Sequence, residues 1–214
     1  MTIVVPAVLA KTQEEFTTKI TNTQLRSVAP LWQIDVLDGS MFDQSSWFEI
    51  SKIAEINNLP ELELHFMISN PLPTIEKCKR QLPTLKRAII HSEIGQQVGH
   101  ILQRISELGL EAGIAINPET PTESIISHIN EIQLLLIMGV NPGASGRPFG
   151  GEAIIKKIEE IKQRFPNLKV GVDGGVNLSN ASEIVAAGTN QLCVASALWE
   201  TEDPQRVYLK LANL

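Results

Sequence analysis

The chain has 214 residues, and its content of 43% hydrophobic and 20% charged residues is typical of a folded globular protein. Its net charge of −6, without a basic cluster, argues against a nucleic-acid surface, and no apolar run approaches the roughly 20 residues that a membrane span needs. The first residues lack a basic stretch followed by a long apolar one, so we expect no secretory signal and a cytoplasmic protein.

Short segments rich in Val, Ile and Leu recur along the chain at fairly even spacing and predict eight β-strands. The predicted strands span residues 3–9, 32–37, 61–67, 87–92, 111–116, 134–140, 169–172 and 191–194. They show little alternation of apolar and polar residues, as expected for parallel strands that are buried on both faces.

Amphipathic segments between the strands predict helices. Thr12 and Glu15 have the spacing of a capping box, which predicts that the first helix begins there. The clearest helix covers residues 152–165, where one face is shared by Ile154, Ile155, Ile158 and Ile161. Later in the chain we expect Ser179 to cap a helix over residues 180–187.

Eight strand–helix units favour an α/β fold, a single (β/α)8 TIM barrel that forms one domain over residues 1–214. An open, doubly wound sheet is the structural alternative. Such a sheet usually has a glycine-rich turn after its first strand, whereas residues 6–10 are Pro-Ala-Val-Leu-Ala. In a barrel, functional side chains gather at the C-terminal ends of the strands.

Polar residues at those ends suggest chemistry. Alternation places Gln33 and Asp35 on the inner side of the second strand, with Ile34 facing the helices. His65 lies in the third strand and Asp173 follows the seventh. Taken singly, Asp35 could be a carboxylate that caps backbone N–H groups, and His65 could be a core histidine whose hydrogen bonds are satisfied. Asp173 could be a residue of a tight turn. Together they place two carboxylates and an imidazole at one barrel mouth.

Two facing carboxylates suit a reaction in which one removes a proton from carbon and the other returns a proton to the opposite face. A divalent metal held by the same residues would polarise the adjacent ketone oxygen and stabilise the developing enolate. His91, at the end of the fourth strand, is interpreted as structural, although polar residues there also face the mouth.

Glycine-rich turns follow strands six, seven and eight, over residues 141–147, 173–175 and 194–197. Backbone N–H groups of such turns commonly bind phosphate in this fold, and Arg147 would add a positive charge. The structural alternative is that all three are only short connections. We favour a phosphate site because the three turns are adjacent in space.

Several of these segments resemble ribulose-phosphate 3-epimerases in sequence, order and spacing, over roughly residues 3–200. They are IDVLDG at 34–39, LHFMI at 64–68, LIMGVNPG at 136–143 and VDGGV at 172–176, and NPETP at 117–121 is similar to the family's Asn-Pro-x-Thr-Pro. The resemblance implies a metal-dependent isomerase that inverts C3 of D-ribulose 5-phosphate to give D-xylulose 5-phosphate.

The resemblance also implies roles for individual residues. Asp35 and Asp173 would be the acid–base pair and metal ligands, with His65 as a third ligand and Gln33 where the family has a metal-binding His. The metal would be Zn, Fe, Mn or Co. Contacts to a sugar phosphate are implied for Ala7, Met67, Met138, Gly143, Ala144, Ser145, Gly146, Gly174, Gly175, Ala195 and Ser196. Such proteins are commonly oligomeric, so a homo-oligomer is compatible with the resemblance.

The departures from the family lie at the functional end of the barrel. Gln33 replaces a His, Ala7 a Ser, Leu37 a Met and Ala195 a Gly. An amide oxygen is a weaker donor to a borderline ion than imidazole. Two hypotheses follow: an epimerase whose metal site is completed by Gln33 or water, or a catalytically impaired or repurposed phosphosugar-binding barrel without metal. An aldol or decarboxylase barrel would need a Lys among the inward carboxylates, and none lies near Asp35 in the sequence.

Overall fold

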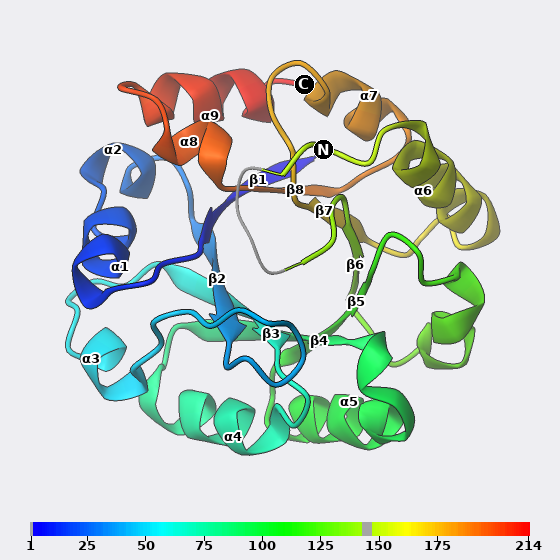
Figure 1. Ribbon diagram of the computed structural model, residues 1–214, viewed down its shortest axis with the longest axis horizontal. Coiled ribbons are helices and arrows are strands. Elements are labelled where there is room, and N and C mark those ends of the chain that lie inside the picture. The colour runs from blue at the N-terminus through cyan, green and yellow to red at the C-terminus, as the bar shows by residue number, and fades with distance from the viewer. Residues whose placement is uncertain (1, 143–146) are drawn as a thin grey trace.

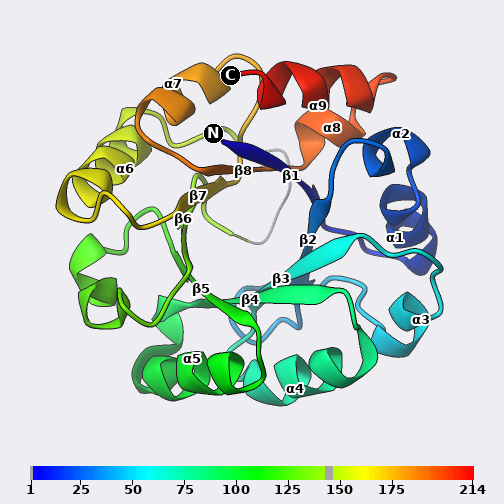
Figure 2. The same ribbon diagram turned by 180° about the vertical axis from the view of Figure 1, so that it is seen from behind.

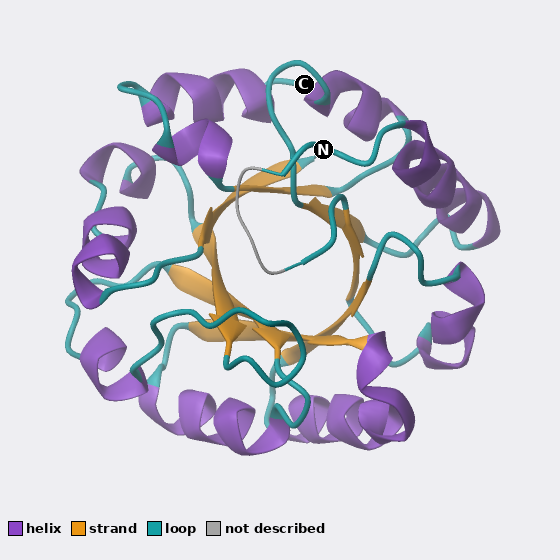
Figure 3. Ribbon diagram, viewed as in Figure 1, coloured by secondary structure: helices purple, strands orange, loops and turns teal. Residues whose placement is uncertain are grey.

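The computed structural model describes residues 2–142 and 147–214. Its eight strands are parallel and close into a barrel in sequence order, with β8 hydrogen-bonded to β1. The strands form an inner ring, and the helices form an outer ring around it (Figure 3). The predicted (β/α)8 barrel is therefore confirmed.

The strands are β1 (Ile3–Val8), β2 (Leu31–Leu37), β3 (Glu61–Met67), β4 (Leu85–His91), β5 (Glu111–Ile116), β6 (Leu134–Met138), β7 (Val170–Asp173) and β8 (Gln191–Val194). The α-helices are α1 (Gln13–Ile20), α2 (Thr23–Arg26), α3 (Ile50–Ala54), α4 (Leu72–Gln81), α5 (Val98–Glu107), α6 (Glu152–Arg164), α7 (Ala181–Ala186), α8 (Ser196–Trp199) and α9 (Pro204–Ala212). Two 3-10 segments, η1 (Ser92–Gln97) and η2 (Thr122–His128), follow β4 and β5.

Figure 1 looks along the barrel axis with the connection from β2 to α3 crossing in front of the strands, and Figure 2 shows the opposite end. The strands therefore end on the side that faces the viewer in Figure 1. Over the part of the chain that the structure describes, no helix combines the length and the apolar character needed to cross a membrane.

The helix starts show how local sequence fixes the elements. Thr12 accepts a hydrogen bond from the backbone N–H of Glu15, which confirms the cap of α1, while the Glu15 carboxylate accepts from the N–H of Lys11. The predicted cap of α7 is wrong. The hydroxyl of Ser179 donates to the Asn177 side chain, and the helix begins at Ala181.

Side chains along each strand alternate between two layers. The outward layer packs against the helices and includes Ile34 of β2, as predicted. The inward layer holds a small apolar cluster of Val5, Ala7, Ile89, Ala115, Leu134, Leu136, Met138 and Cys193. Polar side chains lie at both ends of this inner cluster. The barrel is thus a packed core with one polar group of residues at its floor and another at its mouth.

The floor of the barrel is a buried ion pair. Glu63 on β3 is fully buried, and its Oε2 accepts a hydrogen bond from Arg87 Nη1 at 2.6 Å. The same nitrogen donates to Gln191 Oε1 at 3.1 Å, and Gln191 Nε2 donates to Glu63 Oε1 at 2.6 Å. Burial raises the pKa of Glu63, while the charge of Arg87 opposes that rise. The negative charge at the floor is therefore matched by protein groups.

Replacing Arg87 with Ala should leave the Glu63 carboxylate buried without its cation. We expect the free energy of unfolding to fall by about 3–5 kcal/mol, because an unpaired buried charge retains its desolvation cost. Urea unfolding followed by circular dichroism measures this change.

Lys86→Ala is the matched control, because Lys86 pairs with Glu61 across the same two strands on the exposed side. Its cost should be less than about 1 kcal/mol. Equal losses in the two variants would show that the floor pair has no special importance for stability.

Candidate functional site

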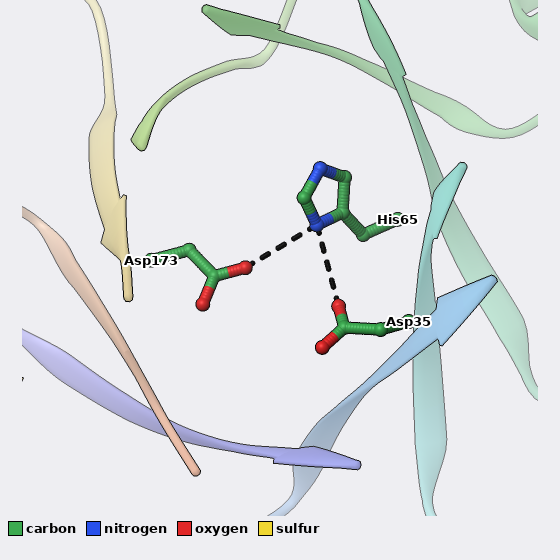
Figure 4. Close-up of side chains that lie close together, drawn as sticks. All are labelled: Asp35, His65 and Asp173. Carbon is green, nitrogen blue, oxygen red and sulfur yellow. Dashed lines mark hydrogen bonds and ion pairs between the residues drawn. The ribbon is translucent and has the colours of Figure 1, made fainter. Parts of the chain in front are cut away.

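Three of the predicted site residues meet at the barrel mouth. Asp35 on β2 lies in register with His65 on β3, and Asp173 ends β7 across the barrel. The Nδ1 atom of His65 lies 3.3 Å from Asp35 Oδ1 and 3.2 Å from Asp173 Oδ2 (Figure 4). All three side chains are buried. One ring nitrogen therefore faces two carboxylates.

Gln33, two residues before Asp35, bridges the same pair. Its Nε2 donates hydrogen bonds to Asp35 Oδ1 at 2.8 Å and to Asp173 Oδ2 at 2.7 Å. Its Oε1 is buried and finds no hydrogen-bond partner among the described residues. The amide thus offers donors to two acidic groups and carries one unused acceptor beside them.

The electrostatics of the cluster favour bound protons or a cation. Burial raises the pKa of Asp35, and the charge of Asp173 raises it further. Burial lowers the pKa of His65, but its hydrogen bonds to Asp173 and Asp35 outweigh this effect and raise the pKa to about 9. The negative charge that two carboxylates concentrate in a buried site contributes to both shifts.

His91 and Glu93 continue the cluster behind His65, and their direct contact with it was missed by the sequence. The Nε2 atoms of His65 and His91 lie 2.9 Å apart, and His91 Nδ1 lies 3.1 Å from Glu93 Oε2. Burial lowers the pKa of His91. Burial raises the pKa of Glu93, but hydrogen bonds from His91 and Thr120 prevail and hold it at about 2. The sequence feature that could have indicated these contacts is the His-x-Glu pair at the end of β4.

A pocket opens above the cluster, and both Asp35 and Asp173 line it. Six residues predicted to contact substrate also line it: Met67, Met138, Gly174, Gly175, Ala195 and Ser196. The other lining residues are Leu9, Val140, Pro142, Arg147, Val176 and Cys193. Asp35 Oδ2 and Asp173 Oδ1 accept no hydrogen bond from the described residues, so each carboxylate keeps one free oxygen.

The turn after β7 needs its glycines. Gly174 and Gly175 have φ of +103° and +73°, which L side chains rarely adopt. A Cβ on Gly175 would lie 2.6 Å from the backbone nitrogen of Phe149. The turn can therefore pass close to the connection after β6 while its backbone borders the pocket.

Among the remaining predicted contacts, the structure describes only Ala7. Ala7 is fully buried in the inner apolar cluster and is not among the residues that line the pocket. Gly143, Ala144, Ser145 and Gly146 fall outside the described residues.

The donor set fits a divalent cation. Asp35, His65 and Asp173 each offer one ligand atom, and these atoms all lie within 4.8 Å of one another. The oxygen and nitrogen of an amide are distinguished only by their hydrogen bonds. Reversing the Gln33 amide would bring its unpartnered Oε1 to the point now held by Nε2, between the two carboxylates. Three oxygens and one imidazole nitrogen would then surround one position.

Comparison with solved structures shows the fold. The structure aligns with Mycobacterium tuberculosis tryptophan synthase at a TM-score of 0.72 and 12% identity, covering 99% of this chain and 91% of that one. It aligns with orotidine 5'-monophosphate decarboxylase from Sulfolobus solfataricus at a TM-score of 0.67 and 12% identity, covering 100% and 97%. These proteins share the barrel architecture.

Sequence comparison is more specific. The chain is 30% identical to the ribulose-phosphate 3-epimerase of Aquifex aeolicus over 200 residues, covering 89% of this chain and 86% of that protein. It is 33% identical to that of Chlamydia trachomatis over 184 residues, covering 82% and 77%. Residues 3–199 match the profile of the "Ribulose-phosphate 3 epimerase family". The site and the sequence thus point the same way, and the chain belongs to the ribulose-phosphate 3-epimerase family.

Proposed function

We propose that this chain is a ribulose-phosphate 3-epimerase, which interconverts D-ribulose 5-phosphate and D-xylulose 5-phosphate by inverting C3. The observation that carries the proposal is the pair of buried carboxylates, Asp35 and Asp173, which line one pocket from strands far apart in the barrel. Inversion requires that a proton leaves one face of a carbon and that another arrives on the opposite face. Two acids on either side of the substrate can perform both steps.

The two carboxylates take opposite roles in the reaction. We assign Asp35 as the general acid because burial and the charge of Asp173 raise its pKa. Asp173 then takes the C3 proton, and Asp35 delivers its own to the other face; the reverse reaction exchanges these roles. Asp35 Oδ1 and Asp173 Oδ2 lie toward Gln33 and His65, which leaves Asp35 Oδ2 and Asp173 Oδ1 for the transfers.

A divalent cation would be held by Asp35, His65 and Asp173, with the amide oxygen of Gln33 as a fourth donor. When bound, it supplies a Lewis acid that polarises the C2 ketone oxygen and makes the neighbouring C3 proton more acidic. Among Zn, Fe, Mn and Co, a set of three oxygens and one imidazole shifts the preference toward Mn²⁺, relative to a site with a second imidazole.

The other side of the pocket suits the phosphate group. Gly174 and Gly175 after β7, and Ala195 and Ser196 after β8, border the pocket with backbone that can donate hydrogen bonds to an anion. Arg147 lines the same pocket and donates to the carbonyl of Asn141 at 3.0 Å. Its side chain is exposed, so its charge can face a phosphate.

A second candidate function is binding of a sugar phosphate without catalysis. The observation that favours it is the Gln33 amide, whose Nε2 satisfies both carboxylates without a cation. The two candidates differ in one measurable property, the exchange of the C3 hydrogen with solvent. An aldolase or decarboxylase has less support, because no lysine is found among the described residues that line the pocket.

Asp173→Asn tests the proton transfer. With ribulose 5-phosphate in D2O and each divalent metal in turn, the wild type should incorporate deuterium at C3, as followed by proton NMR. The variant should lose about 10²–10⁴-fold in rate, because an amide cannot take up the proton.

Asp203→Asn is the control, because Asp203 caps α9 away from the pocket and Asn caps a helix equally well. It should leave the exchange rate unchanged. A wild type that exchanges no deuterium with any metal, while still binding the substrate, would favour the second candidate.

Gln33→His tests the donor set. An imidazole at this position should raise the affinity for Zn²⁺ more than that for Mn²⁺, because imidazole suits the softer ion better than an amide oxygen does. Competition with a chromophoric chelator measures both affinities without reference to activity. If neither ion binds the variant more tightly than the wild type, position 33 does not contribute to the cation site.

The raised pKa of His65 predicts a pH dependence of stability for the cation-free protein. Since this pKa rises from the usual 6.5 to about 9, its contribution is complete below about pH 6.5 and is lost as pH rises through about 9. The free energy of unfolding should fall by roughly 3 kcal/mol across this window. Urea titrations at both ends of the window should show a smaller fall in His65→Gln, whereas equal falls would assign the effect to other groups.

A further inference from the structure

Behind the two carboxylates, three side chains form a continuous hydrogen-bonded series from His65 through His91 to Glu93. The imidazole rings of His65 and His91 are fully buried and nearly parallel, with centroids 5.0 Å apart and planes 15° apart. Phe42 packs edge-on against His91, with centroids 5.5 Å apart. Little water can therefore reach the two rings, and their polar atoms depend on one another and on Glu93.

The short contact between the two histidines allows only one arrangement of protons at a time. Their Nε2 atoms lie 2.9 Å apart, so one Nε2 carries a hydrogen and the other accepts it. The contact between His91 and Glu93 decides which of the two Nε2 atoms carries the hydrogen. Glu93 is an acceptor when ionised, and its Oε2 lies 3.1 Å from His91 Nδ1. His91 Nδ1 must then carry the hydrogen, which leaves His91 Nε2 as the acceptor and His65 Nε2 as the donor.

We infer that Glu93 and His91 are positioning residues that hold the hydrogen of His65 on Nε2 and so reserve His65 Nδ1 for a cation between Asp35 and Asp173. This inference rests on the proposed function only in requiring that a cation binds there. Neither residue touches substrate. A second partner that fixes the proton position of a ligating histidine is a general feature of metal sites.

The contacts of the other Glu93 oxygen mean that replacing one carboxylate oxygen with an NH2 group would change the proton positions of both histidines. Glu93 Oε1 accepts hydrogen bonds from the backbone N–H of Asn117, at 2.8 Å, and from the hydroxyl of Thr120. In Glu93→Gln, the single amide oxygen must face this backbone N–H, because an NH2 group there would leave two donors opposed. The NH2 group would then face His91 and donate to Nδ1. His91 Nε2 would then become the donor and His65 Nε2 the acceptor, so a neutral His65 would have to keep its hydrogen on Nδ1, where the cation would bind.

The first readout is the protonation of each ring nitrogen in cation-free protein, from long-range ¹H–¹⁵N NMR of labelled histidines. In the wild type, the unprotonated nitrogen of His91 should be Nε2. In Glu93→Gln it should be Nδ1, and His65 Nε2 should lose its hydrogen. A wild type whose His91 is unprotonated at Nδ1 overturns the inference without any variant, as does a Glu93→Gln protein with the wild-type pattern.

The second readout is the affinity for Mn²⁺ alone, from the electron paramagnetic resonance signal of the free ion. We expect Glu93→Gln to bind Mn²⁺ about 10–100-fold more weakly. Thr120→Val is the matched control, because it removes a contact of the same carboxylate but leaves the His91 side intact. It should keep the wild-type proton pattern and nearly the wild-type affinity. Equal losses of affinity in both variants would show that Glu93 acts only by anchoring the loop after β5.

The two proposals fail in different ways. If deuterium exchange is absent but the NMR pattern and the Mn²⁺ loss are as expected, the epimerase proposal is wrong and the positioning of His65 stands. If exchange occurs and the NMR pattern is reversed, the enzyme works without this device.

Discussion

Two like charges in a buried space set the conditions for the rest of the mouth. Asp35 and Asp173 are both mostly removed from water, and their facing oxygens repel unless protons, donors or a cation lie between them. The protein supplies donors from two directions, the amide of Gln33 and the ring of His65. Burial and this repulsion raise the pKa of Asp35, which favours the protonated form that a general acid needs.

The carboxylate at the floor of the barrel has different partners from the two carboxylates at the mouth. Glu63 is as deeply buried as the acids at the mouth, but Arg87 and Gln191 satisfy both of its oxygens. At the mouth, no Arg or Lys of the described chain pairs with Asp35 or Asp173, and each keeps an oxygen free toward the pocket. The inner apolar cluster separates the two polar groups. The barrel therefore satisfies both carboxylate oxygens at one end and leaves each acid at the other with an oxygen free for chemistry, as a reactive site requires.

Much of this could be predicted because strands carry strong local signals. Apolar runs located all eight strands to within two residues, and alternation correctly turned Asp35 inward and Ile34 outward. The sequence could not show that Gln33 binds an acid 140 positions away from it, or that His91 meets His65, since both contacts depend on barrel register. The cap at Ser179 failed for a local reason, because its hydroxyl donates to the side chain of Asn177 two residues earlier.

Among these tertiary contacts, those of Gln33 have the largest effect on the two acids and on the proposed cation position. An imidazole at this position could offer a cation one lone pair, or a carboxylate one hydrogen, but it could not bridge both acids with two donors from one nitrogen. The amide can do this in one orientation and can present an oxygen ligand in the other. The choice costs a rotation about one side-chain bond and leaves the backbone in place. Gln33 thus satisfies both acids without a cation, and a cation at the proposed position would have to compete with these internal hydrogen bonds.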